Sequence, residues 1–160
     1  MELLIGSYDL KLDSKMRVSL PQQFRLALKV QPTNEVLLTV GADGCVVLGD
    51  VDHYGTDYLD KLGRLDWTRA EDRALLRDMA PRTFRVRIDS ECRVTLPPAL
   101  VQWAGLKAGD TVRAQGMSRY IEMWEVRRLE TLAARGTSFE DRLERRLGQV
   151  EPPRPSESNG

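Results

Sequence analysis

The stretch DSKMRVSLP at residues 13–21 is repeated as DSECRVTLP at residues 89–97. The two copies share Asp-Ser, then Arg-Val, a hydroxyl residue, Leu and Pro, and every shared pair lies 76 positions apart. A constant offset over so many positions indicates duplication of one structural unit. Two such copies usually pack as a pseudo-symmetric pair rather than as a long solenoid, so we expect two related halves.

Each copy predicts a turn, a short strand and a short helix. The Asp-Ser pair can bond its side-chain oxygens to nearby backbone amides and so hold a tight turn. The Arg-Val-Ser-Leu and Arg-Val-Thr-Leu segments alternate polar and apolar residues, which is typical of a half-buried strand. Pro21 and Pro97 end these strands and suit the first position of a following helix, expected at residues 22–28 and 98–104.

The same patterns extend to the rest of the chain. Alternating apolar residues predict strands at 2–12 and 83–88 that lead into the two turns, and turn residues predict two hairpins. The hairpins are expected at residues 35–48 and 110–124. Further helices are expected at 52–62, 68–79, 125–135 and 138–147, the second with a capping box of Thr68 and Glu71.

The doubled motif resembles a known family. The pattern DSKxRxxxPxxxR over residues 13–25 is echoed as DxxxRxxxPPxL over residues 89–100, before Trp-Ala-Gly-Leu at 103–106. This pattern is similar to that of the MraZ family of bacterial transcriptional regulators, which resemble a fused pair of AbrB-type swapped-hairpin domains. The resemblance covers residues 1–135 and implies an α+β fold, a duplicated swapped-hairpin β-barrel with pseudo-twofold symmetry and peripheral helices.

We expect five regions along the chain. They are a first AbrB-like half at 1–50, a helical connector at 51–80, a second AbrB-like half at 81–125, C-terminal helices at 126–147 and a disordered tail at 148–160. The last helix has an apolar stripe of Phe139, Leu143 and Leu147, which fits a solvated helix and a partner-binding helix equally well.

Four basic residues are the candidates for DNA contact. The resemblance points to Lys15, Arg17 and Arg93, and local charge points to Arg25. Arg17 and Arg93 open their strands beside the turns and point off the apolar face, where a guanidinium can meet an anion. An alternative is that these two arginines pair with Asp13 and Asp89 and brace their own turns. The two roles do not exclude each other.

The remaining motif residues are expected to be structural, and some depart from the family pattern. Asp13, Pro21, Asp89 and Pro97 are expected to shape the turns and the helix starts. Met16 and Cys92 stand at positions that are typically Gly in the family, where a positive φ would cost each on the order of 1 kcal/mol. Glu91 replaces the lysine of the first copy, and Val101 replaces its Arg25. The second half therefore offers fewer basic groups.

Charge and composition exclude several other classes. The 24 basic and 24 acidic residues cancel, so a DNA site must come from local segregation of charge or from assembly of several copies. The absence of a long apolar run and of a basic opening predicts no membrane span and no signal peptide. Cys45 and Cys92 are expected to be reduced thiols and His53 a surface residue, with no metal site, no cofactor, no catalytic residue and no small-molecule substrate.

The sequence thus predicts a non-enzymatic, sequence-specific DNA-binding transcriptional regulator. It is expected to act as a homo-oligomer in the cytoplasm, associated with the nucleoid. The resemblance further implies a ring that binds double-stranded DNA at promoter repeats and controls the division and cell-wall gene cluster, including its own gene. An alternative is an oligomeric scaffold or protein-partner-binding module with weak or no DNA binding, and a third is an antidote-like partner of a toxin through the C-terminal helix and tail.

Overall fold

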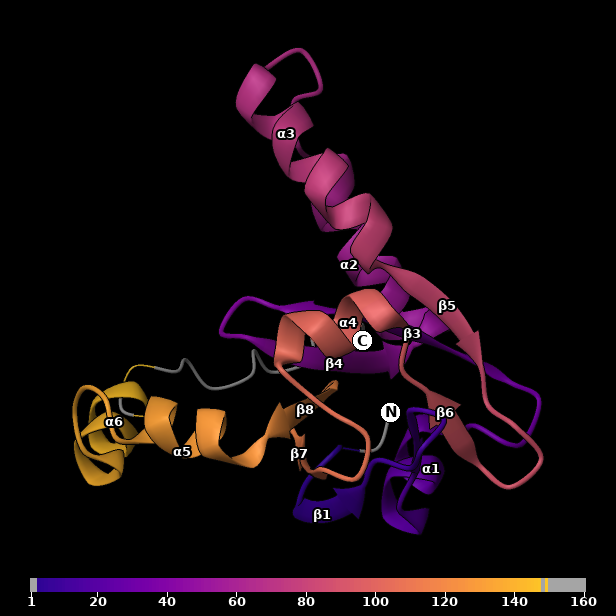
Figure 1. Ribbon diagram of the computed structural model, residues 1–160. Helices are drawn as coiled ribbons and strands as arrows, with labels where there is room; N and C mark the ends of the chain where they lie inside the picture. Colours follow the sequence, from indigo (N-terminus) through magenta and orange to yellow (C-terminus); the bar gives the residue numbers. More distant parts are fainter. Residues whose placement is uncertain (1–2, 148, 150–160) are drawn as a thin grey trace, which may run out of the picture. The chain divides into compact units, whose positions relative to one another are not determined.

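Two antiparallel sheets and six α-helices make up the described part of the chain, residues 3–147 and 149, in this computed structural model (Figure 1). The predicted α+β class is confirmed. The larger sheet has strand order β1-β7-β8-β4-β3-β5, and the smaller pairs β2 with β6. The strands are β1 Ser7–Lys11, β2 Arg17–Ser19, β3 Glu35–Gly41, β4 Cys45–Asp50, β5 Phe84–Arg87, β6 Arg93–Thr95, β7 Thr111–Gly116 and β8 Ile121–Glu125.

The larger sheet interleaves the two halves of the sequence. β1, from the first half, pairs with β7 of the second, and β5, from the second half, pairs with β3 of the first. The registers correspond at the 76-residue offset of the motif: Tyr8 faces Ala114, and Phe84 faces Leu38. β4 and β8 meet at the centre, where Val47 faces Glu122. Each leading strand therefore completes the hairpin of the other half.

The helices follow the sequence pattern closely near the motifs. The short helices are α1 Gln22–Leu28 and α4 Pro98–Ala104, as predicted. Pro21 and Pro97 stand at the N-cap, one position earlier than expected, with φ of −56° and −60°. The other helices are η1 Val51–Gly55, a π-helix, α2 Thr56–Gly63, α3 Ala70–Met79, η2 Ala80–Arg82, a 3-10 turn, α5 Val126–Ala133 and α6 Phe139–Leu147.

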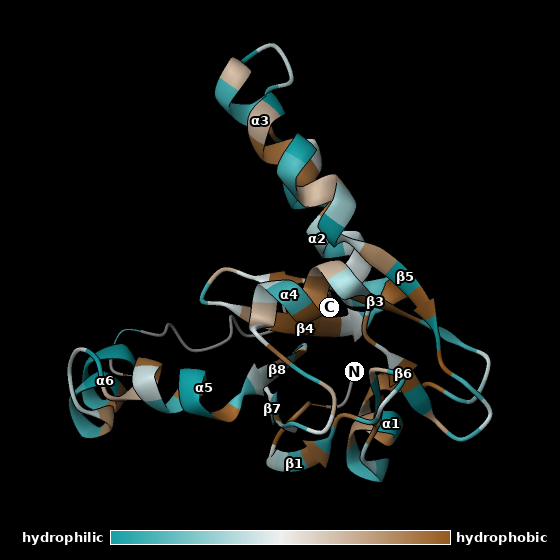
Figure 2. Ribbon diagram, in the orientation of Figure 1, coloured by the Kyte–Doolittle hydropathy of each residue, from teal (hydrophilic) through white to brown (hydrophobic). Residues whose placement is uncertain are grey.

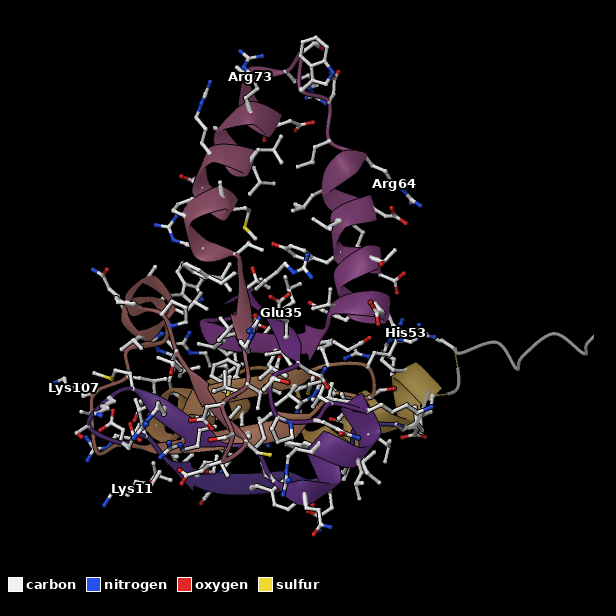
Figure 3. The ribbon with its side chains drawn as sticks, turned by 90° about the vertical axis from the view of Figure 1, so that its right-hand side faces the viewer. Lys11, Glu35, His53, Arg64, Arg73 and Lys107 are labelled. Atoms are coloured by element: carbon white, nitrogen blue, oxygen red, sulfur yellow. The ribbon has the colours of Figure 1, made fainter. Side chains whose placement is uncertain are left out.

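Between the halves, α2 and α3 form a helical hairpin that projects from the sheet, and Arg64 and Arg73 lie toward its far end (Figures 1 and 3). The predicted capping box at Thr68 is wrong. Its hydroxyl donates to Asp66 Oδ1 at 2.5 Å instead of accepting from the helix, and α3 begins only at Ala70. Arg69 is the N-cap residue and has no side-chain cap hydrogen bond, so Thr68 lies one position too early to cap the helix.

The core lies between the larger sheet, the β2–β6 ribbon and the helices α1 and α4. Buried apolar side chains from both halves form one cluster, and β4 is largely hydrophobic in Figure 2. The cluster includes Leu12, Val18, Phe24, Leu38, Leu48, Ile88, Val94, Leu100, Ile121 and Met123. Each fully buried Leu or Ile stabilises the fold by about 1.5–3 kcal/mol relative to exposure, and both halves contribute such residues to this one core.

The described residues divide into two compact units, one that ends at Leu129 and one that begins at Glu130. In the second unit, α6 exposes Phe139, Leu143 and Leu147, which are 64%, 44% and 66% accessible. The tail predicted to be disordered, residues 148–160, lies outside the described residues except for residue 149. No helix in the described part of the chain is both long enough and apolar enough to cross a membrane.

Candidate nucleic-acid interface

The β2–β6 ribbon brings the two motif copies together. Arg17 pairs with Thr95, Val18 with Val94 and Ser19 with Arg93. Val18 and Val94 are fully buried, and alternate residues of a strand point to opposite faces. The outer face, which we call the arginine face, therefore consists of Arg17, Ser19, Arg93 and Thr95. The two arginines predicted from sequence lie on one surface, diagonally across the ribbon.

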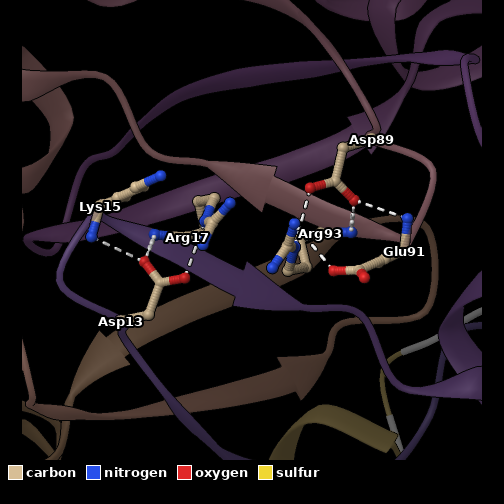
Figure 4. Close-up of polar contacts among 6 residues, drawn as sticks. All are labelled: Asp13, Lys15, Arg17, Asp89, Glu91 and Arg93. Atoms are coloured by element: carbon tan, nitrogen blue, oxygen red, sulfur yellow. Dashed lines mark hydrogen bonds and ion pairs between the residues drawn. The ribbon is translucent and has the colours of Figure 1, made fainter.

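In the first turn, Asp13 holds the backbone in place. Its Oδ1 accepts hydrogen bonds from the amides of Lys15 and Arg17, each at 2.9 Å, and its Oδ2 accepts from Arg17 Nε at 2.7 Å (Figure 4). The amide of Met16 donates to the Asp13 carbonyl at 3.0 Å. The expected bracing role of the Asp–Arg pair is thus present, and it presents the arginine at a fixed angle.

The second turn repeats this geometry. Asp89 Oδ1 accepts from the amides of Glu91 and Arg93 at 2.9 Å each, and Oδ2 accepts from Arg93 Nε at 2.8 Å (Figure 4). The amide of Cys92 donates to the Asp89 carbonyl at 3.0 Å. Each of these bonds of the first turn therefore has its counterpart at the 76-residue offset.

The third residue of each turn differs in charge. Glu91 Oε2 lies 2.8 Å from Arg93 Nη2, so the guanidinium of Arg93 is engaged by two carboxylates. Arg17 has the single carboxylate of Asp13, at 2.7 Å. Within the described residues, the Lys15 ammonium has no hydrogen-bond or ion-pair partner. Each arginine is therefore held by the aspartate of its own turn, but the charge of Arg93 is balanced by two carboxylates and that of Arg17 by one.

The two glycine-like positions have the backbone that the family pattern suggested. Met16 and Cys92 both have φ of +60°, in the left-handed region that favours glycine. Their carbonyls also join the turns, because Leu96 N donates to Met16 O at 2.8 Å and Leu20 N donates to Cys92 O at 3.0 Å. Each turn thus supports the chain that follows the opposite turn.

Arg25 lies differently from the other three candidates. Its Nη1 donates to Cys92 Sγ at 3.3 Å, and its buried Nε has no hydrogen-bond partner in the described part of the protein. Arg25 thus links α1 of the first half to the turn of the second. The matching position on α4 holds Val101, which is buried. No sequence signal predicted this link, since the partners are 67 residues apart.

The ionisation of the turn carboxylates follows from these bonds. For Asp89, the hydrogen bond from the Arg93 amide is the largest cause and lowers its pKa. For Asp13, desolvation acts in the opposite direction, but the bonds from Arg17 and Lys15 outweigh it and lower the pKa. The pKa of Arg93 is raised by its hydrogen bond to Asp89, with further contributions from Glu91 and Asp13. Both turns therefore keep their ion pairs at neutral pH.

The other titratable residues singled out from the sequence lie away from the ribbon or are buried. His53 Nδ1 lies 2.8 Å from Asp50 Oδ2, and the His53 side chain is exposed, as expected. Cys45 and Cys92 are free and buried, and burial raises the pKa of the Cys45 thiol. Among the described residues, no group of three or more His, Cys, Asp or Glu is placed to hold a metal ion.

Comparison with known proteins gives the family. The family model for MraZ, described as "MraZ protein, putative antitoxin-like", matches residues 3–78. The transcriptional regulator MraZ of Thermus thermophilus is 34% identical over 123 residues, covering 77% of this chain and 82% of the relative. The transcriptional regulator MraZ of Thermomicrobium roseum is 30% identical over 145 residues, covering 88% and 97%.

Among solved structures, the solution structure of PHS018 from Pyrococcus horikoshii matches with a TM-score of 0.35 and 13% identity. The match covers 75% of this chain and 96% of that chain. The sequence relatives decide the question: the chain belongs to the MraZ family.

Proposed function

We propose that this chain is a sequence-specific, DNA-binding transcriptional regulator rather than an enzyme, and that the arginine face is its DNA-contacting surface. Membership of a family whose relatives are transcriptional regulators supports the first part. The observation that carries the second is the placement of Arg17 and Arg93 on one exposed face of a two-stranded ribbon. B-DNA's major groove admits such a ribbon, and arginine can bind guanine edges there in a bidentate way.

In this proposal Lys15 and Arg17 make the main contacts, and Arg93 and Arg25 contribute less. Lys15 has no partner within the described residues and reaches phosphate as a point charge, which sets affinity and salt dependence. Arg93 already bonds two carboxylates, and Arg25 bonds Cys92. Asp13, Asp89, Pro21 and Pro97 shape the turns and the helix starts.

The proposal includes an architecture. We propose a pseudo-twofold, duplicated swapped-hairpin barrel built from residues 1–50 and 81–125, with a connector at 51–80 and C-terminal helices at 126–147. The matched strand registers and the paired turn bonds at a 76-residue offset support it. We propose that the barrel acts as a homo-oligomeric ring, because a chain without net charge needs several copies to bind phosphate strongly. The ring is proposed to lie in the cytoplasm, associated with the nucleoid.

The proposed target is double-stranded DNA at promoter repeats of the division and cell-wall gene cluster, including the protein's own gene. The test is binding of the purified protein to DNA from upstream of that gene, against scrambled DNA of equal length, over a salt series. Selective binding that weakens with salt and is lost in Arg17→Ala supports the proposal. No selective binding by a folded oligomer at low salt would sink it.

A second candidate function has specific support. The balanced net charge, the Glu91 carboxylate on Arg93 and the internal bond of Arg25 favour an oligomeric scaffold or partner-binding module. The apolar stripe of α6 and the antitoxin-like description of the family also fit an antidote-like role toward a toxin. For either role, Arg17→Ala leaves partner binding unchanged, which separates both from DNA binding.

A further inference from the structure

We infer that the two turns of one chain differ in their contact with DNA. The first turn binds DNA, and Glu91 prevents the second turn from binding it. This inference rests on the proposed function and gives each protomer a polarity. Glu91 is then a specificity-determining residue that acts through Arg93, and one turn per chain, instead of two, reaches the nucleic acid.

The contacts of the two arginines carry the first step. Arg93 donates from Nε to Asp89 Oδ2, and its Nη2 forms an ion pair with Glu91 Oε2, both at 2.8 Å, so two of its nitrogens face carboxylates. Bidentate recognition of a phosphate or of a guanine needs two parallel N–H donors of one guanidinium. Arg17 donates Nε to Asp13, which leaves Nη1 and Nη2 without a carboxylate partner among the described residues. The first arginine has the free fork that the second lacks.

The second step is electrostatic. The Glu91 side chain is 67% exposed and lies beside the arginine face, where a DNA phosphate bound to Arg93 would come. Like charges at such an interface are repelled, and the carboxylate already occupies the guanidinium. Lys15 stands at the matching position of the first turn and attracts phosphate instead. A single residue pair, Lys15 and Glu91, therefore sets which turn binds.

Both turns are braced in the same way, which makes the inference testable. Arg17→Ala and Arg93→Ala each remove one Asp–Arg pair of equal geometry, and Arg93→Ala also removes the ion pair with Glu91. A larger loss of DNA affinity in Arg17→Ala than in Arg93→Ala therefore reports contact with DNA, because Arg17→Ala removes fewer internal contacts. The bond from the Glu91 amide to Asp89 uses the backbone, so substitution of the Glu91 side chain leaves the turn intact.

The experiment measures affinity for the upstream DNA as a function of salt for matched variants. Glu91→Gln is expected to raise affinity by about three- to tenfold, because it removes one repulsive charge and frees Arg93. Glu91→Lys is expected to raise it further and to steepen the log–log salt slope by about one for each added phosphate contact. Glu71→Lys makes the same charge change on α3, where the side chain is 87% exposed, and serves as the control for general electrostatics.

The double variant Lys15→Glu/Glu91→Lys tests the inference most directly, because it exchanges the charges of the two turns. Lys15→Glu alone is expected to lower affinity by about tenfold or more, and the swap to restore it to within about threefold of the wild type. In the swapped protein, Arg93→Ala should abolish binding and Arg17→Ala should be mild, the reverse of the wild type. Circular dichroism and sizing confirm that each variant keeps its fold and oligomer.

Two results overturn the inference, and a third also removes the proposed function. Wild-type binding that Arg17→Ala and Arg93→Ala weaken equally overturns it, as does a Glu91→Lys affinity no higher than that of Glu71→Lys. If the wild type does not bind DNA selectively at low salt, the proposed function itself fails. If the wild type binds selectively and one of the first two results is found, the proposed function stands and only the inference fails.

Discussion

The turn at residues 13–17 and the turn at residues 89–93 have the same backbone and opposite charge at their third residue. Both are closed by an aspartate that accepts two amides and one guanidinium, and both pass through a left-handed residue. Only Lys15 and Glu91 distinguish their charge. The duplicated bonds thus maintain the shape of both turns, whereas the side chains of Lys15 and Glu91 make none of these hydrogen bonds and differ in charge.

The largest expected effect is a loss of stability on substitution of the two buried valines of the ribbon. Val18 and Val94 face each other at the centre of the ribbon and are fully buried, so Val18→Asp or Val94→Asp buries an uncompensated charge. Each is expected to lower the free energy of unfolding by about 3–5 kcal/mol. Urea denaturation measures this, with the exposed Ser19→Asp as a control that should stay within about 0.5 kcal/mol. A large loss for only one of the two valines would break the equivalence of the halves.

Acid should weaken both turns together. The pKa values of Asp13 and Asp89 are lowered in the folded protein from an ordinary 3.8, so these carboxylates stabilise it above that value. The contribution is lost as the pH falls through the lowered folded-state pKa. Thermal melts between pH 6 and pH 2 should show a steeper loss for the wild type than for Asp13→Asn/Asp89→Asn, which starts less stable. Parallel curves would mean that the aspartates do not hold the turns.

Arg25 should affect stability and DNA binding less than Arg17. Its Nη1 bonds Cys92 and its buried Nε is unpartnered within the described residues, so Arg25→Met removes an unsatisfied donor and keeps the packing. We expect a stability change of no more than about 1 kcal/mol. We also expect a smaller loss of DNA affinity than for Arg17→Ala, measured on the same DNA. An equal or larger loss would place Arg25 on the DNA and restore its expected role as a direct contact.

The smallest expected effect separates the two left-handed residues. Glycine at φ of +60° relieves on the order of 1 kcal/mol of strain at either position. Met16→Gly loses a half-buried side chain, whereas Cys92→Gly also loses the bond from Arg25. Met16→Gly should therefore be the more stable variant, by about 1 kcal/mol, in urea denaturation. The reverse order would mean that the thiol strains the second turn.

Local sequence predicted much of the site. The repeat predicted the turns, the strands and helices α1 and α4, because Asp side chains and prolines act on backbone within a few residues. The positive φ at Met16 and Cys92 was also predictable, because the family typically has glycine at these positions and glycine adopts a positive φ readily. The Thr68 capping box was wrong because α3 begins at Ala70, so that Arg69 and not Thr68 is the N-cap residue.

The sequence alone determines the repeated unit, which consists of two Asp–Arg turns, each followed by a strand, a proline and a short helix. Folding in three dimensions was needed to establish that β1 completes the second hairpin and β5 the first, and that Arg17 and Arg93 share one face. It also placed Arg25 against Cys92. The two kinds of feature differ in the sequence distance between the residues involved. Turns and caps are set by bonds between near neighbours, whereas the pairing of each leading strand with the other half depends on burying apolar faces that lie far apart in the chain.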